Sequence, residues 1–351
     1  MHIVTGKNGA GKSRFFQYAT RRIYEENLQS QGGFTRLLCL SGTLHDKYPR
    51  EIVGRKEGRS DVVYLGYKVN NNMFSELTPF RTSLPFLLNQ EQATADACRS
   101  VKDLLQSINI DAEIEFGLRL ARGAANELRG ELPQSFRIDL THHSQTVDEH
   151  APVLAALVEQ KVALSDIFFQ RDGQTFGAEE LSSGERSYLQ SVLGAAFCGS
   201  RNSVFFYDEP ENSLHPEWHL KMARDISDLV GELHSDSVIV IATHSPLVAS
   251  SIPNNKLLIC DLPRDQKWSS SNLHGKTNDA ILSEHFHLFS PRSKEVAILI
   301  QKCLSELTKG KASEPIFQRS ADSLFDMELV IGDDDPLYSV LETILKNRDH
   351  P

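Results

Sequence analysis

The residues whose types and spacing carry the clearest chemistry form a glycine-rich loop near the first residue of the chain. Residues 6–13 read Gly-Lys-Asn-Gly-Ala-Gly-Lys-Ser, a complete G-x-x-x-x-G-K-S pattern. In such a loop consecutive backbone N–H groups face phosphate oxygens, Lys12 reaches the β- and γ-phosphates, and the Ser13 hydroxyl binds Mg²⁺. An apolar run precedes the loop and a segment of helical composition follows it, as a phosphate site at a helix N-terminus requires. The pattern predicts binding of Mg²⁺ and a nucleoside triphosphate through Asn8, Gly9, Ala10, Gly11, Lys12, Ser13 and Arg14.

Two adjacent carboxylates follow a second apolar segment. Residues 204–207 are Val-Phe-Phe-Tyr, which is typical of a buried strand, and Asp208 and Glu209 come next. In that setting we expect Asp208 to hold Mg²⁺ and Glu209 to polarise the attacking water. A further buried-type strand at 238–242 is followed by His244, at the edge where a parallel sheet presents its ligand groups.

Residues 181–185, Leu-Ser-Ser-Gly-Glu, stand before another segment of helical composition. Small residues at a helix N-terminus suit a second phosphate-contacting surface. The predicted contacts there are Ser182, Ser183, Gly184 and Glu185. Each motif has an ordinary structural explanation when it stands alone, since acidic pairs cap helices and single histidines are commonly structural. Their joint occurrence in this order indicates an ATP site with Mg²⁺.

In this order the motifs resemble those of the ABC-type ATPase superfamily. Residues 6–13 match its Walker A loop, residues 207–210 its Walker B motif with the catalytic Glu, and His244 its switch histidine. Residues 181–185 match its signature motif, except that a Ser and a Glu replace the usual Gly and Gln at the third and fifth positions.

A narrower resemblance rests on two stretches of sequence. Residues 208–216 read Asp-Glu-Pro-Glu-Asn-Ser-Leu-His-Pro and include a D-loop, and residues 243–246 read Thr-His-Ser-Pro. These two stretches are similar in sequence to those of the RecF/OLD-like ATPases, many of which are subunits of bacterial anti-phage systems such as the Septu-type ATPase. The resemblance implies an α/β fold with a mostly parallel P-loop NTPase sheet, an inserted helical lobe that carries the signature motif, and a helical C-terminal tail.

The same resemblance implies a mechanism that needs two protomers. They would meet head to tail as a homodimer or higher oligomer, with each ATP between Lys12 of one protomer and Ser182 to Gly184 of the other. ATP binding would close the dimer. Hydrolysis, with Glu209 aligning water and His244 sensing the γ-phosphate, would open it.

Two features depart from the superfamily pattern. The glycine-rich loop begins at the sixth residue, whereas such domains usually carry roughly two strands before it, so we expect a base-facing lobe that is reduced or rebuilt. No clean Q-loop is present either, and an Asn of the stretch 62–72 is the candidate replacement for its Gln.

Spacing along the chain suggests three parts. Residues 1–80 and 176–265 would form the ATPase core, residues 81–175 the inserted helical lobe, and residues 266–351 a C-terminal helical segment with an acidic tail. Within the insert we predict an amphipathic helix over 151–170. No heptad pattern is sustained, so no coiled coil is predicted.

Composition agrees with a cytoplasmic enzyme. The chain has 351 residues, a net charge of −10 and five cysteines without a C-x-x-C pair, which indicates neither a disulfide framework nor a zinc site. No signal peptide is recognised, and no apolar run approaches the ~18 residues that span a bilayer, so no membrane association is expected. Asp333, Asp334 and Asp335 precede Pro336 and are typical of a helix cap.

Charge is distributed unevenly. Lys and Arg outnumber Asp and Glu by 11 to 5 in residues 1–60, whereas the acids prevail by 8 to 2 in residues 320–351. Part of the basic excess lies at 50–59, where it could contact nucleic-acid phosphates, although interleaved acids weaken that interpretation. The acidic end carries an apolar-faced stretch at 337–345 that suits docking of helix-in-groove type.

Three hypotheses about function follow. The leading one is a regulatory ATPase of anti-phage defence that holds a separate effector, a nuclease or a toxin. The second is a DNA-repair ATPase that acts on DNA directly, which would need a basic groove. The third, a transporter subunit, is disfavoured because 168 residues separate Ser13 from Leu181, more than the roughly hundred typical of transporter ATPases.

Overall fold

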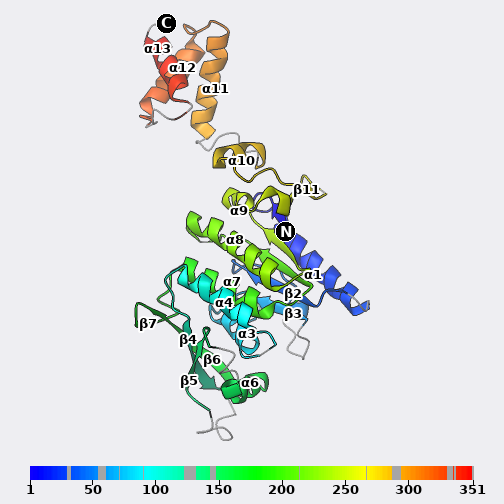
Figure 1. The fold of residues 1–351 in the computed structure, drawn as a ribbon. Coiled ribbons are helices and arrows are strands. Elements are labelled where there is room, and N and C mark those ends of the chain that lie inside the picture. Colours follow the sequence, from blue (N-terminus) through cyan, green and yellow to red (C-terminus); the bar gives the residue numbers. More distant parts are fainter. Residues whose placement is uncertain are drawn as a thin grey trace. The chain divides into compact units, whose positions relative to one another are not determined.

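A computed structural model describes residues 1–29, 33–53, 61–70, 72–89, 91–121, 132–142, 148–212, 214–265, 267–286, 294–329, 335 and 337–349. The chain comprises two compact units, residues 1–276 and residues 277–351 (Figure 1). All the motifs of the predicted nucleotide site belong to the first unit. Ser213 of the predicted D-loop, together with Asp333, Asp334 and Pro336 of the predicted helix cap, lies outside the described residues.

The first unit is built on a seven-stranded sheet with the order β11-β10-β1-β9-β8-β2-β3. Its strands are β1 (His2–Thr5), β2 (Arg36–Ser41), β3 (Val62–Leu65), β8 (Ser203–Asp208), β9 (Val238–Ala242), β10 (Leu258–Asp261) and β11 (Ser269–Ser270). All neighbours pair in parallel except β10 and β11, which are antiparallel. The sheet confirms the predicted α/β class with a mostly parallel P-loop NTPase sheet.

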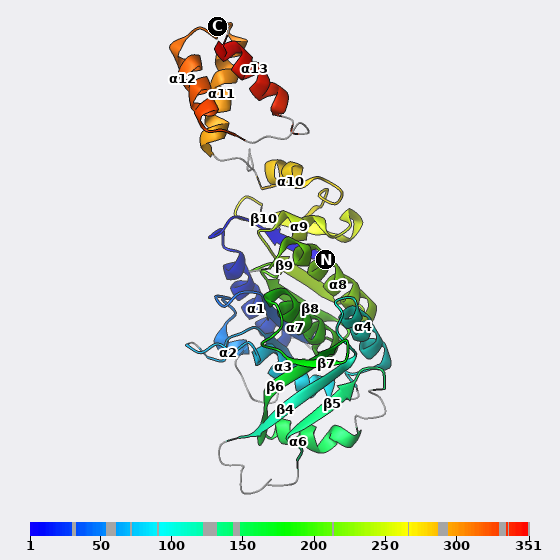
Figure 2. The ribbon, with the colours of Figure 1, turned by 90° about the vertical axis from the view of Figure 1, so that its left-hand side faces the viewer.

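Helices cover both faces of this sheet (Figure 1 and Figure 2). On one face α1 (Lys12–Gln29) inserts Phe16, whose ring stacks on Phe206 with centroids 4.9 Å apart. The opposite face receives α7 (Ser183–Cys198) and α8 (Pro216–Leu233), where Phe205 stacks on His234. Because both faces are buried, β8 is apolar at consecutive positions instead of alternating.

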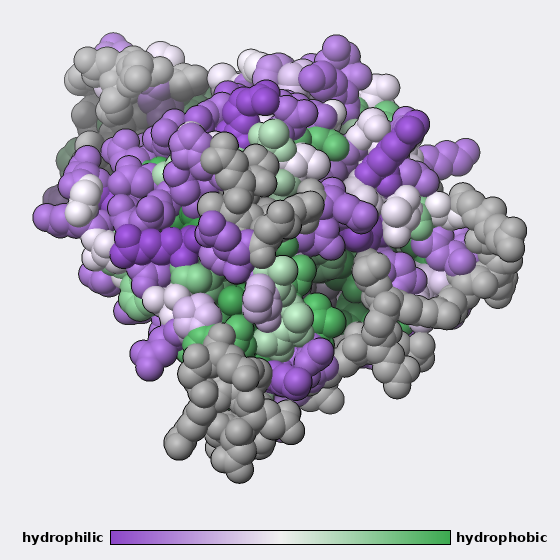
Figure 3. All heavy atoms as spheres, turned by 60° about the horizontal axis from the view of Figure 1, so that its bottom comes forward, coloured by the Kyte–Doolittle hydropathy of each residue, from purple (hydrophilic) through white to green (hydrophobic). Residues whose placement is uncertain are grey.

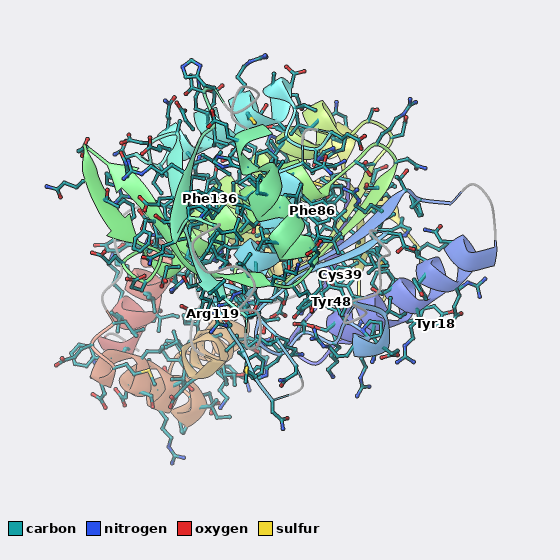
Figure 4. All side chains as sticks on the ribbon, turned by 90° about the horizontal axis from the view of Figure 1, so that it is seen from below. Tyr18, Cys39, Tyr48, Phe86, Arg119 and Phe136 are labelled. Carbon is teal, nitrogen blue, oxygen red and sulfur yellow. The ribbon has the colours of Figure 1, made fainter. Side chains whose placement is uncertain are left out.

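Shorter elements complete the core of the first unit. Figure 4 shows Tyr48, from the loop between β2 and α2, beside Cys39 of β2, whereas Tyr18 points outward from α1. The elements are α2 (Arg50–Val53), α9 (Pro246–Ser250) and the 3-10 turn η3 (Asn254–Lys256).

The insert between β3 and α7 is mixed, which corrects the predicted helical lobe. It contains a four-stranded antiparallel sheet with the order β5-β4-β6-β7. Figure 3, which looks onto the end of the first unit that carries the insert, shows mostly hydrophilic residues and one smaller group of hydrophobic ones. The elements are α3 (Thr78–Leu87), α4 (Ala95–Gln106), β4 (Glu113–Leu120), β5 (Ser135–Asp139), η2 (Asp148–His150), α6 (Ala151–Val158), β6 (Val162–Arg171) and β7 (Gln174–Gly177).

The helix predicted over 151–170 is wrong in its second half. The helix α6 ends at Val158, and Gln160 takes a left-handed φ of 57° before β6 begins. Leu164 and Ile167 are spaced as on one helix face, but Ile167 and Phe169 point to the buried side of a strand. Over so short a segment, apolar residues three positions apart are compatible with one face of a helix and also with a strand that contains one irregular step.

The second unit is helical and has an apolar core of its own. Its helices are α10 (Asn278–Glu284), α11 (Lys294–Thr308), α12 (Pro315–Asp326) and α13 (Tyr338–Asp349). Phe317 of α12 is fully buried among Ile300, Cys303 and Ile344. None of the described helices in either unit is long and apolar enough to cross a membrane.

The core of the second unit generates a stability prediction. Phe317→Ala should cost that unit about 3–5 kcal/mol, the usual penalty for emptying a buried aromatic site. Amides of α11 to α13 should then exchange with solvent much faster by mass spectrometry, while those of β1 and β8 keep their protection. The matched variant is Ile316→Ala, whose side chain is 60% exposed and which should change the unit by less than about 0.5 kcal/mol. Equal loss of protection in both units would contradict a separate core.

Candidate functional site

The motifs meet at one edge of the main sheet. The strands β1, β9 and β8 are parallel neighbours, and Ala242 pairs with both Val4 and Asp208. Since the carboxyl ends of parallel strands share an edge, the glycine-rich loop after β1, the acidic pair at the end of β8 and His244 after β9 come together. The structure thus groups three of the four predicted motifs within one protomer.

The glycine-rich loop takes a conformation that requires glycine. Gly9 and Gly11 have φ values of 83° and 103°, in the region that side chains disfavour. At Gly6 a Cβ would lie 2.6 Å from the carbonyl oxygen of Leu262. The loop then leads directly into α1 at Lys12, so its N–H groups stand at a helix N-terminus.

Lys12 lies inside the curve of its own loop. Its side chain is 4% exposed, and Nζ donates to the carbonyl oxygens of Gly6 at 2.9 Å and Lys7 at 3.4 Å. The ammonium also lies 3.5 Å from Oε1 of Glu209. The loop therefore holds a positive charge at the place where the sequence predicts phosphate.

Asp208 is a buried carboxylate with unused bonding capacity. Its exposure is 0%, and neither carboxylate oxygen receives a hydrogen bond of ordinary geometry from the described residues. Burial above all, with the charges of Glu209 and Asp46, raises the pKa of Asp208 to about 7 against the lowering effect of the nearby Ser13 hydroxyl and Lys12. Such a group is stabilised by a cation.

The donors at this edge fit Mg²⁺. Asp208 supplies one carboxylate and Ser13 one hydroxyl beside it, and Mg²⁺ usually takes one or two protein ligands and fills the rest with water and phosphate oxygens. Among the described residues no group of three or more His, Cys, Asp or Glu side chains could hold a metal ion by itself. Asp208 and Ser13 would therefore supply two ligands, with water or phosphate oxygens as the others.

Glu209 is held in a strained position between Lys12 and His244. Its φ of 49° is left-handed although it is not a glycine, and such strain persists where the surroundings fix it. Its carbonyl oxygen faces Gly42 so closely that no Cβ would fit there. Interaction with the His244 imidazole, followed by the charge of Lys12, lowers the pKa of Glu209 below its ordinary value despite partial burial, so the carboxylate is an ionised acceptor.

His244 lies between two carboxylates. Its Nδ1 is 3.2 Å from Oε1 of Glu211 and 3.7 Å from Oε1 of Glu209. These neighbours, Glu209 first, raise the pKa of His244 against the opposing effect of burial. The protonated form of the imidazole is therefore more stable here than in a free histidine side chain.

Glu211 was not singled out by its sequence position, which lies in the predicted D-loop. It is buried, and its Oε1 accepts from the Thr243 hydroxyl at 2.5 Å and from the His244 backbone N–H at 2.8 Å. Glu211 thus anchors the segment that carries His244. The available signal was a third carboxylate two residues after Glu209 in a strand-end motif.

Asp46 is a second residue that sequence reasoning missed. It is buried after β2, and it accepts from the Tyr64 hydroxyl at 2.8 Å and the Tyr48 backbone N–H at 3.3 Å. Lys68 Nζ lies 3.6 Å from its carboxylate. Tyr64 and Lys68 belong to the stretch 62–72, in which an Asn was predicted to replace the Gln of the Q-loop. This stretch contacts Asp46 through Tyr64 and Lys68. Within the described residues, Asn70 caps the backbone N–H of Asn72.

The signature motif begins α7 as a complete capping box. Ser182 is the N-cap, the Glu185 backbone N–H donates to its hydroxyl at 3.2 Å, and Glu185 Oε2 accepts from the Ser182 backbone N–H. Arg171 of β6 holds the other Glu185 oxygen at 2.5 Å. These bonds end within the motif and the insert, and none reaches Lys12, Asp208 or Glu209.

Helix packing requires a glycine at position 184. A Cβ there would collide with the indole of Trp218 on α8, so glycine permits the close approach of α7 and α8. Ser182 and Ser183 remain exposed. The sequence-predicted contacts therefore fall into two groups in one protomer, and in the second group Ser182 and Ser183 face solvent.

The fold and these motifs define a P-loop NTPase. A family model described as "AAA domain, putative AbiEii toxin, Type IV TA system" matches residues 64–250. The chain belongs to this family. The matched region includes Asp208, Glu209 and His244 and begins after the glycine-rich loop.

Other relatives match less of the chain or match it weakly. Protein ea59 of Escherichia phage lambda is 33% identical over 75 residues, which are 21% of this chain and 14% of ea59. A structure titled "An inward-facing conformation of a putative metal-chelate type ABC transporter" has a TM-score of 0.35 at 13% identity, covering 82% of this chain and 78% of that one. UvrA2 from Deinococcus radiodurans has a TM-score of 0.30 at 16% identity, covering 81% and 35%. Both TM-scores are too low to support an inference about function.

The raised pKa of Asp208 generates a prediction about stability and pH. From its ordinary value of 3.8 up to about 7, the folded protein keeps a proton that the unfolded chain releases, so the free energy of unfolding falls as pH rises through this window. Asp208→Asn removes that penalty. Without Mg²⁺ at pH 8 it should be more stable than wild type by up to about 4 kcal/mol, and the gap should close near pH 4 in urea unfolding curves.

The control is Asp228→Asn, an exposed aspartate of α8, which should leave the pH dependence of stability unchanged. Adding Mg²⁺ with ATP should stabilise wild type and Asp228→Asn but not Asp208→Asn. A stability gap for Asp208→Asn that is the same at pH 4 and pH 8 would refute the buried charge as its cause.

Proposed function

We propose that the protein binds ATP and Mg²⁺ at the edge formed by β1, β8 and β9 and hydrolyses ATP there. The observation that carries this proposal is the buried Asp208 carboxylate, which has no ordinary hydrogen-bond partner among the described residues and stands beside Ser13 and the loop of Lys12. In this proposal residues 8–14 contact the phosphates, and Ser13 and Asp208 hold the metal.

The chain's own residues then have distinct tasks. Mg²⁺, when bound, neutralises charge on the phosphates. Lys12 exchanges the carbonyl oxygens of its loop for phosphate oxygens, and His244 donates to the γ-phosphate. Glu209, released from these two cations, orients a water molecule and accepts its proton. In the resting state of this mechanism Glu209 is therefore held by Lys12 at 3.5 Å and by His244 at 3.7 Å.

The signature is proposed to act on the nucleotide of a second protomer. Ser182 and Ser183 are exposed, and the bonds of the capping box do not reach the glycine-rich loop of the same chain. A head-to-tail dimer would bring the N-terminus of α7 to the phosphates. Glu185 would support that surface through Ser182 and Arg171 rather than contact phosphate itself.

We further propose that nucleotide state regulates a separate effector, a nuclease or toxin, as in anti-phage defence of the Septu type. Family membership supports a role in a system of this kind, because the family description names a putative toxin and a type IV TA system. Direct action on DNA has less support. Arg50, at the start of the basic stretch 50–59, turns its guanidinium onto the Tyr64 ring and the carbonyl of Val69, and residues 54–59 lie outside the described residues.

Turnover is the first test of this function. Glu209→Gln should bind ATP and Mg²⁺ with near wild-type affinity and hydrolyse ATP at least ~100-fold more slowly, because it loses the proton acceptor. Lys12→Ala should weaken ATP binding itself, measured by fluorescent nucleotide titration. The matched control is Glu232→Gln, an exposed glutamate of α8. Wild-type turnover by Glu209→Gln would show that this carboxylate is not the catalytic one.

Complementation tests the shared site. Ser183→Arg is preferable to a change at Ser182, since losing the N-cap would itself destabilise α7 by about 1 kcal/mol. Each of Lys12→Ala and Ser183→Arg should be nearly inactive alone, whereas a mixture should recover activity because a heterodimer keeps one intact composite site. A fully active monomer in sedimentation with ATP, or no recovery on mixing folded variants, would argue against the composite site.

A further inference from the structure

The second unit contains an apolar cavity that no part of the nucleotide site uses. Its volume is about 550 Å³, and it lies between α12 and α13. Leu324 on α12 and Leu341 and Leu345 on α13 contribute apolar walls. The volume accommodates several leucine-sized side chains, which is the scale of a binding groove for a small apolar group or a helix face.

Large apolar side chains stand exposed at this cavity. Phe325 is 53% exposed, Tyr338 42% and Leu329 36%, and all three line it. Scattered exposed hydrophobic residues are ordinary, but three gathered around one hollow form a patch of the kind that marks an interaction site. The adjoining core residue Phe317 is fully buried, so the patch is built on a packed base.

The polar residues of the lining share one sign. Asp326, Glu328 and Glu342 line the cavity, and no Lys or Arg does so among the described residues. The two basic residues of α13 are already engaged. Lys346 pairs with Glu342 at 2.9 Å, and Arg348 pairs with Asp322 at 2.7 Å while its guanidinium lies 4.0 Å from the centroid of the Phe325 ring. In sequence, residues 320–351 carry 8 acidic against 2 basic side chains.

We propose that this groove binds an amphipathic helix of a partner protein whose apolar face is bordered by Lys and Arg. Apolar anchors at i, i+3 or i+4, and i+7 would enter between α12 and α13, and the basic residues would meet Asp326 and Glu328. Charge complementarity favours this occupant over a second copy of the acidic unit, whose like charges would repel. The groove would be the docking surface for the effector of the proposed function. The role of the partner rests on that proposed function, whereas binding of the helix itself requires no ATP.

The test uses the full chain and a defined probe. The probe is a fluorescein-labelled 14-residue peptide with leucines on one helical face and lysines elsewhere, followed by fluorescence anisotropy. A scrambled peptide of the same composition lacks the apolar face, and a second peptide has glutamate in place of lysine. We expect saturable binding of the probe, at least tenfold weaker binding of either comparison peptide, and weakening with salt because the rim charges are exposed.

Variants locate the binding. Leu329→Ser, in the groove, should weaken probe binding at least tenfold, whereas Ile298→Ser, a 51% exposed apolar residue of α11 outside the lining, should not. Asp326→Lys should weaken it and restore binding of the glutamate peptide. Hydrogen exchange of α11 to α13 checks that each variant is folded.

The outcomes separate the groove from the ATP site. Equal binding by Leu329→Ser and Ile298→Ser, or no binding at 100 μM probe by folded protein, would overturn the proposal. Self-association in sedimentation that Leu329→Ser abolishes and Ile298→Ser keeps would identify a second copy as the occupant and also overturn it. Lys12→Ala should bind the probe like wild type, so a failed ATPase assignment and a failed groove give different results.

Discussion

A buried carboxylate at the end of a central strand is the constraint on which the arrangement of the first unit depends. Asp208 ends β8, whose two faces are covered by helices, so no water competes for its oxygens. A charge in such a place must be paired or neutralised. The nearest ammonium, Lys12, is engaged by the carbonyl oxygens of its own loop. The pKa of Asp208 is raised because its negative charge is buried without a cation to neutralise it fully. A divalent cation would supply the missing positive charge.

The charges around this carboxylate alternate in sign and hold one another in place. Glu209 lies between Lys12 and His244, and His244 in turn lies against the buried Glu211. The strained backbone of Glu209 is kept by close contact with Gly42. In the proposed mechanism, phosphate groups draw the two cations away, so nucleotide binding and release of the catalytic carboxylate are one event. Preorganisation of this kind is available because the groups come from separate strands of a rigid sheet.

The insert and the signature are linked by a short chain of contacts. Arg171 near the end of β6 holds Glu185, and Glu185 holds Ser182 at the first turn of α7. A shift of the antiparallel sheet would therefore move the surface proposed to meet the second protomer's nucleotide. The second unit has its own core and its own acidic, apolar groove between α12 and α13. The proposed exchange with a partner and the proposed ATP chemistry thus use separate structural parts.

The sequence by itself predicted several strands and the loop after β1, because apolar runs and glycine spacing are local signals. The resemblance of its motifs to those of ABC-type ATPases implied the parallel sheet of the first unit. The sequence also placed Asp208, Glu209 and His244 at strand ends, where a parallel sheet must gather them. Only the tertiary structure decided that β6 is a strand, since an interval of three between apolar residues suits a helix as well as an irregular strand. Only it brought Asp46 and Glu211 to the site, because their positions depend on loops folded against distant strands rather than on neighbours in sequence.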